Sequence, residues 1–195
     1  MKTPRRAIRA LVSGAAALGL CGGLATSVSA QAYASRDPEF PVRFTYSADW
    51  ALEESQGRLE PYREVRLRGS RNAENTYTAY VTIRRTPLRA QGGRYEALDD
   101  AVAAQTAQLP EGAVVELQAT RQIGGLRAEE LIIAYTIPPM HRAGLRAVAI
   151  PVRTRTILLQ EGTSLSELVF SADAREYASQ AAVLDQVLAH LELTP

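Results

Sequence analysis

The C-terminal stretch 150–195 constrains the fold most, because it predicts two strands followed directly by one long helix. Apolar and threonine side chains alternate with arginines over 150–158, and a second apolar run follows the Gly-Thr-Ser turn at 162–164. A two-residue period is typical of a strand with one buried face. From Glu176 on, apolar residues recur at three- and four-residue spacings, which gathers them into one helical stripe. The stripe consists of Tyr177, Ala181, Leu184, Leu188 and Leu191. We therefore expect a helix that closes over an antiparallel hairpin.

The preceding chain predicts more strands and one further helix. Gly124-Gly125 lies between two alternating segments and is a good signal for a two-residue hairpin. An Ala-rich run with helical spacing begins near Tyr95 and ends at Pro110, a helix stop signal. Trp50 follows a turn, and we expect it in the core. The segments with strand periodicity are 42–46, 64–68, 77–84, 114–123 and 126–137, and we expect the second and third to form a hairpin.

Residues 1–30 predict a secretory signal peptide that is cleaved after Ala30. A basic segment, an apolar run over 10–20 and the small-residue pattern at 28–30 supply its three parts. A transmembrane anchor is the alternative, but glycines interrupt the apolar run well short of the ~20 residues needed to span a bilayer. Cys21 suggests a second alternative, a bacterial lipoprotein signal that ends in a lipid-modified cysteine. Leu20 argues against it, because a lipoprotein signal normally has Gly, Ala or Ser before the cysteine.

Export predicts a periplasmic or extracellular destination. Arg5-Arg6 leaves twin-arginine export open beside the general secretory route, although the surrounding residues match that pattern poorly. The segment 31–41 is small, polar and contains proline, so we expect a flexible tether. Residues 42–195 then have the size of a single domain, and we expect no transmembrane segment in the mature chain.

The composition of the mature chain excludes several kinds of chemistry. Without the signal, 18 basic residues stand against 21 acidic ones and no basic block remains, which argues against nucleic acid binding. Cys21 is the only cysteine and Lys2 the only lysine. The mature chain therefore offers no disulfide, no cysteine-ligated zinc and no Schiff-base lysine. We expect no cofactor, no metal and no catalytic residues, because the sequence contains none of the common catalytic motifs.

The loop 138–145 is the segment most suggestive of function, because loops between long strands often carry binding residues. His141 beside Arg142 suggests an anion or metal site, but an exposed loop tip is the simpler interpretation without a second ligand nearby. With Tyr135 and Met140, these residues form our tentative ligand or partner loop.

Glu129 and Glu130 are a second candidate pair. Alternation sends them to opposite faces of a sheet, and Glu130 is expected to be a paired edge charge or to line a cleft. The less favoured hypothesis built on them is a hydrolase with a dispersed carboxylate site.

The order of elements from Val42 onward resembles the PsbP-like family of exported proteins. The segments that carry the resemblance are Tyr46-Ser47-Ala48-Asp49-Trp50, the glycine-turned hairpin from Ile123 through Tyr135, and Leu168-Val169-Phe170-Ser171-Ala172-Asp173. Ser47 stands where proline is common in the family. The resemblance implies an α+β fold in which helices flank an antiparallel sheet, an α/β/α sandwich. It also implies an accessory or binding role without catalysis. The metal-binding histidines and photosystem contacts of the photosynthetic members find no matching residues here.

Two hypotheses of function follow. The first is an exported, non-catalytic accessory protein that binds another component of the cell envelope. The second is a carrier of a small ligand, held between the sheet and a helix or under the 138–145 loop.

Overall fold

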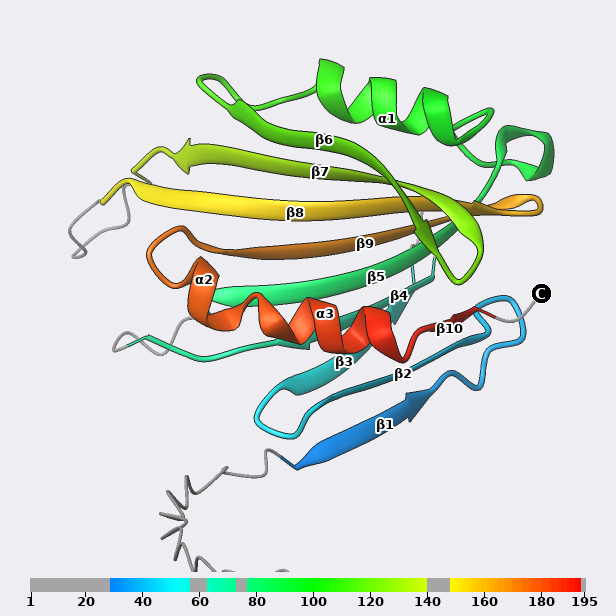
Figure 1. The fold of residues 1–195 in the computed structure, drawn as a ribbon, viewed down its shortest axis with the longest axis horizontal. Coiled ribbons are helices and arrows are strands. Elements are labelled where there is room, and N and C mark those ends of the chain that lie inside the picture. Colours follow the sequence, from blue (N-terminus) through cyan, green and yellow to red (C-terminus); the bar gives the residue numbers. More distant parts are fainter. Residues whose placement is uncertain (1–28, 57–62, 73–76, 140–147, 194–195) are drawn as a thin grey trace, which may run out of the picture.

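An antiparallel sheet of seven strands forms the centre of the described structure (Figure 1). The computed structural model describes residues 29–56, 63–72, 77–139 and 148–193. The strand order is β3-β4-β5-β9-β8-β7-β6, and each neighbouring pair is antiparallel. The strands are β3 (Ala51–Gln56), β4 (Arg63–Arg68), β5 (Ala79–Pro87), β6 (Val114–Ile123), β7 (Leu126–Ile137), β8 (Ile150–Glu161) and β9 (Ser164–Asp173).

The predicted strand pairs are confirmed. β4 pairs with β5, β8 pairs with β9, and β6 pairs with β7 over the predicted ranges. Gly124 and Gly125 have φ angles of +57° and +81°, the left-handed conformation that a tight hairpin turn requires at both central positions. β6 has a bulge between Val115 and Leu117.

A second, three-stranded sheet of order β1-β2-β10 contains the segment that the sequence predicted to be a tether. Its strands are β1 (Ala30–Ala34), β2 (Val42–Ser47) and β10 (Glu192–Leu193). β1 pairs with β2 in register, and Tyr33 and Phe40 are buried in the larger core. The tether prediction for 31–41 is therefore wrong, because two aromatic side chains fix this segment to the fold.

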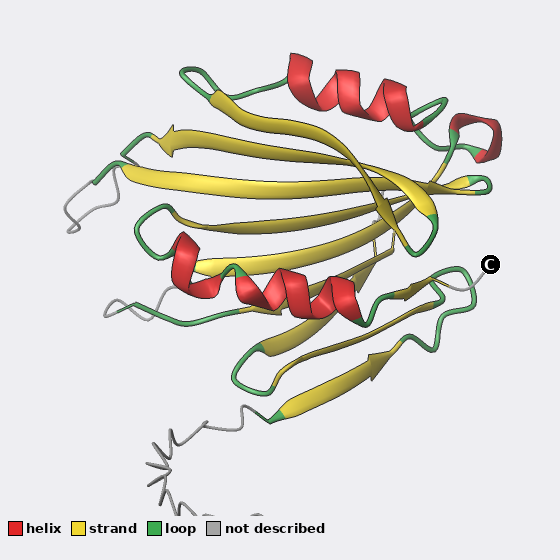
Figure 2. Ribbon diagram, in the orientation of Figure 1, coloured by secondary structure: helices red, strands yellow, loops and turns green. Residues whose placement is uncertain are grey.

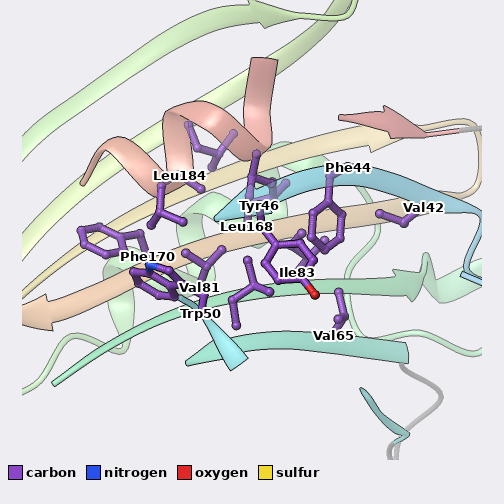
Figure 3. Packing of buried hydrophobic residues seen from close by; sticks show 14 of the residues in the cluster. Val42, Phe44, Tyr46, Trp50, Val65, Val81, Ile83, Leu168, Phe170 and Leu184 are labelled. Atoms are coloured by element: carbon purple, nitrogen blue, oxygen red, sulfur yellow. The ribbon is translucent and has the colours of Figure 1, made fainter. Parts of the chain in front are cut away.

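The larger core lies between one face of the seven-stranded sheet, strand β2 and the C-terminal helices (Figure 3). The helix that the sequence predicted as one unit is divided at Ala181 into α2 (Tyr177–Gln180) and α3 (Ala182–Ala189). The Leu184 N–H donates to Ala181 O, a three-residue step that interrupts the α-helical pattern. Leu184 and Val187 are fully buried against the sheet.

The smaller core lies on the opposite face of the same sheet, under α1 (Leu98–Ala107). Figure 2 shows α1 on the β6 side of the sheet, away from α2 and α3. In β8, Ile157 and Leu159 belong to the larger core whereas Leu158 belongs to the smaller one, as alternation requires. Helices thus flank the sheet on both faces, which confirms the predicted α+β sandwich. The described residues contain no helix of the length and hydropathy that crossing a bilayer needs.

Candidate functional site

A cavity of about 300 Å³ lies on the α1 face of the seven-stranded sheet. Side chains of β5, β8 and β9 line it from the sheet, Gln105 of α1 lines one side, and the loop 92–95 lines another. The sheet contributes Arg84, Thr86, Leu158, Leu165 and Glu167. The cavity therefore lies between the sheet and a helix, where the carrier hypothesis placed a ligand.

Two glycines shape the loop that covers the cavity. After the 3-10 turn η1 (Arg89–Gln91), Gly92 has φ +89° and donates its N–H to Arg89 O at 2.9 Å. The Gly93 N–H donates to Leu88 O at 3.0 Å. A Cβ atom at Gly93 would lie 1.7 Å from Pro87 O, so only glycine fits there. This tight turn holds Arg94 and Tyr95 at the cavity.

Glu167 and Arg84 form the polar part of the cavity wall. Their positions pair across β5 and β9, and an Arg84 Nη1–Glu167 Oε2 distance of 3.7 Å joins the two side chains. The Gln105 amide donates to the Glu167 carboxyl. Burial raises the pKa of Glu167, and Arg84 and Gln105 oppose that rise. Glu167 is therefore a carboxyl that takes up a proton more readily than an exposed one.

Arg84 is held from the other side by Glu64 of β4. Its Nε and Nη2 atoms donate to the Glu64 carboxylate at 3.1 and 2.8 Å. Arg66 also donates to Glu64, at 2.7 Å. Glu64 is 4% exposed, so its buried carboxylate holds the Arg84 guanidinium in one position.

The remaining cavity wall is apolar except at its rim. Leu158 and Leu165 are buried in the smaller core, and the half-buried Tyr95 packs against that core. The Arg94 guanidinium is exposed and lies 5.4 Å from the centroid of the Tyr95 ring. The cavity thus combines an apolar floor with one carboxyl and two guanidinium groups, which suits an amphipathic small molecule.

Of the residues in the predicted ligand or partner loop, Tyr135 is the one that the structure describes, and it does not line this cavity. Tyr135 is half-buried in β7 and pairs with Val152, whereas the cavity residue Leu158 pairs with Glu129 nearer the other end of these strands. Met140, His141 and Arg142 lie outside the described residues. The sequence signal that could have found the cavity is Gly92-Gly93 followed by an arginine and a tyrosine, because paired glycines indicate a tight turn.

Glu130 is a paired charge, as the sequence favoured, but it is buried and does not lie at an edge of the sheet. It is 1% exposed, because β6 and β8 flank β7 and each contributes an arginine to it. Arg155 Nε lies 2.6 Å from Glu130 Oε1, and Arg121 donates to the other oxygen. Arg155 also donates to Asp185 of α3 at 2.7 Å, which connects the sheet to the helix.

Glu129 is buried as well, with its own set of partners on the α1 face. It accepts hydrogen bonds from Thr120 Oγ1 at 2.9 Å and from Arg127 Nη2 at 2.8 Å. Glu129 and Glu130 thus bind different arginines and do not act on one site. Each carboxylate is held as an ion-pair partner, so this pair gives the hydrolase hypothesis no support.

The sequence matches no family model and no curated protein. Several solved structures share the fold. The solution structure of cyanobacterial PsbP (CyanoP) from Synechocystis sp. PCC 6803 has a TM-score of 0.54 at 14% identity, over 91% of this chain and 99% of that one. LpqN, described as involved in cell envelope biogenesis of Mycobacterium tuberculosis, has a TM-score of 0.51 at 16% identity, over 86% and 91% of the two chains.

A third structure extends the comparison to Pseudomonas aeruginosa. PA94, a protein of unknown function described as a putative regulator, has a TM-score of 0.51 at 15% identity, over 85% of this chain and 98% of that chain. Matches that cover nearly all of both chains show that the protein has a PsbP-like fold, as the sequence predicted.

Proposed function

We propose that this protein is an exported, non-catalytic accessory protein that binds another component of the cell envelope. The observation that carries the proposal is the match in fold over most of the chain to CyanoP and to LpqN, of which the latter is described as involved in cell envelope biogenesis. The signal peptide predicted at 1–30 supports an extracytoplasmic location. A periplasmic or extracellular site of action follows from both together.

The charge arrangement supports a binding role over a catalytic one. Among the described residues, the three carboxyls that are 5% exposed or less, Glu64, Glu129 and Glu130, all accept hydrogen bonds from arginines. A general acid or base needs a proton-transfer group aimed at a reacting atom. These carboxylates instead connect neighbouring strands, which stabilises a rigid scaffold that presents a surface.

We place the partner contact at the end of the sheet that the 138–145 loop joins. The large apolar residues exposed in the described part are Val114, Val115, Val148 and Ile150. Val114 begins β6, and Ile150 begins β8 and pairs with Ile137. Val148 lies just before β8. Exposed apolar side chains gathered at one end of a sheet are typical of a protein contact. The proposal includes the loop residues Met140, His141 and Arg142, with Tyr135 nearby on β7.

Cross-linking in the native envelope tests this proposal. The tagged mature protein is cross-linked gently in its own cells, purified and analysed by mass spectrometry for attached proteins. We expect one partner at near-equal amount, and we expect Val114→Asp with Ile150→Asp to remove it. Thr163→Asp in the exposed turn between β8 and β9, at the other end of the sheet, is the matched control and should keep the partner. Recovery of the protein without any specific partner would overturn the proposal.

A further inference from the structure

We propose that the cavity beside Glu167 binds a small organic carboxylate with an apolar body, such as an aromatic acid or a short fatty acid. This inference is independent of the accessory role, because the cavity and the proposed partner contact lie at different ends of the sheet. It assigns the carrier function to a cavity whose lining residues come from other segments of the chain than 138–145.

The balance of charge around the cavity favours an anion. Arg84 and Arg94 line the cavity, and Glu167 is the only carboxyl among the lining residues. Behind them, Glu64 holds Arg84 and Arg66 together. These groups sum to a net positive charge even when Glu167 is ionised. On the same face, Glu129 is already matched by Arg127, so it does not reverse this balance.

Arg94 provides the group that a ligand carboxylate can reach. Its guanidinium stacks near the Tyr95 ring, and none of the described residues forms an ion pair with it. A planar guanidinium beside an aromatic ring binds a carboxylate through two hydrogen bonds while the ring covers the adjacent apolar part of the ligand. Arg84 adds electrostatic attraction from the polar part of the cavity wall, although its Nε and Nη2 donors are occupied by Glu64.

When Glu167 carries a proton, its carboxyl favours the binding of a ligand carboxylate. Its side chain is 21% exposed, it lines the cavity, and it already accepts a hydrogen bond from Gln105. In its protonated form the carboxyl donates one hydrogen bond, which a ligand carboxylate accepts. Burial raises the pKa of this group, which lowers the cost of binding the proton. Binding therefore takes up a proton, and the affinity falls as the pH rises.

The size and the lining of the cavity determine how large and how apolar the body of the ligand is. A volume of about 300 Å³ is at the lower end for a small-molecule site. Leu158, Leu165 and the Tyr95 ring provide the apolar contacts. A single ring or a short alkyl chain fills this space, whereas a nucleotide or a large lipid does not.

The test uses 3-phenylpropionate and 2-phenylethylamine, which have similar size and opposite charge. Each is titrated into the ¹⁵N-labelled mature protein while amide shifts are followed by NMR, at about pH 5.5 and about pH 7.5. We expect the acid to shift amides of 92–95, Gln105 and Glu167, to bind more weakly at the higher pH, and to bind roughly tenfold more tightly than the amine.

Two variants separate binding from folding. Arg94→Gln should weaken binding of the acid by roughly tenfold or more, because a charge-assisted hydrogen bond is lost. Glu167→Gln keeps a hydrogen-bond donor and should keep binding of the acid while abolishing its pH dependence. Arg36→Gln and Glu111→Gln, both exposed and outside the cavity lining, are the matched controls and should bind like the native protein.

Three results would overturn the inference: tighter binding of the amine, shifts confined to amides outside the cavity at millimolar acid, or an unchanged pH dependence in Glu167→Gln. None of these depends on recovery of an envelope partner. A failed cross-linking experiment with a successful titration would leave a ligand carrier, and the reverse would leave an accessory protein with an unused cavity.

Discussion

Glu130 has the exposure of a core residue while it carries a charge, and the two arginines that bind it explain how this is stable. We expect Glu130→Ala to lower the free energy of unfolding by about 3 kcal/mol, because Arg155 would remain buried without that partner. Urea denaturation followed by circular dichroism measures the change. In the matched control, Glu96→Ala removes the exposed ion pair with Arg89 and should cost about 1 kcal/mol or less. Equal losses in the two variants would show that Glu130 is not held as described.

Because its pKa is raised, Glu167 affects the pH dependence of stability differently from most carboxyls. The folded protein keeps the proton at pH values where the unfolded chain, with its ordinary value of 4.5, has released it. The stabilisation from Glu167 is therefore fully present below that value and declines as the pH rises through the raised folded pKa.

Glu167→Gln isolates this effect, because other titrating groups cancel in the difference between the two proteins. We expect the native protein to lose stability relative to the variant as the pH rises from about 4 to about 8. Urea denaturation at a series of pH values measures the difference. A difference that does not vary with pH would contradict the assignment of a raised pKa.

At the scale of the elements, the segment 31–41 offers the sharpest test of the fold. Phe40 is 3% exposed and belongs to the larger core, and Tyr33 lies 4.9 Å from the Phe44 ring between centroids. We expect Phe40→Ala to cost roughly 3–5 kcal/mol of unfolding free energy, the usual loss for a buried aromatic side chain. The exposed Arg36→Ala serves as the control and should change little. A flexible tether would tolerate both changes equally.

The same elements show what the sequence could predict. The β6–β7 and β8–β9 hairpins were predictable because each has a local turn signal between two segments of clear alternation. β1 was missed because Ala-Gln-Ala-Tyr-Ala has little apolar surface, and its burial depends on contacts with β2 rather than on its own pattern. The break at Ala181 was missed because the helical stripe continues through it.

The cavity could not be predicted because it has no sequence motif. Arg84 and Glu167 are far apart in the chain and meet only because β5 pairs with β9 in one particular register. The loop residues Arg94 and Tyr95 join them only because Gly93 allows a close approach to Pro87 O. Burial of Glu130 escaped prediction for a related reason, since its arginines come from two different strands.

At the scale of the whole molecule, one sheet separates two cores of unequal size. The larger core joins strands of both sheets to α3, whereas the smaller one consists of a few side chains between α1, the loop before it, β8 and β9. Less apolar surface holds α1 to the sheet, so its free energy of local opening should be smaller. The cavity lies under this more weakly held layer, and a ligand could enter it by a local opening that leaves the sheet intact.

Hydrogen exchange tests this difference between the two layers. We expect amides of α1 to exchange with a lower opening free energy than those of β8 and β9. Leu98→Ala should increase exchange in α1 alone, because Leu98 belongs to the smaller core. Leu184→Ala, the same change in the larger core, should reduce protection throughout the molecule, because Leu184 joins α3 to the sheet. If α1 and β9 instead exchanged together in both variants, the molecule would open as one unit, and ligand entry would require unfolding of the whole sheet.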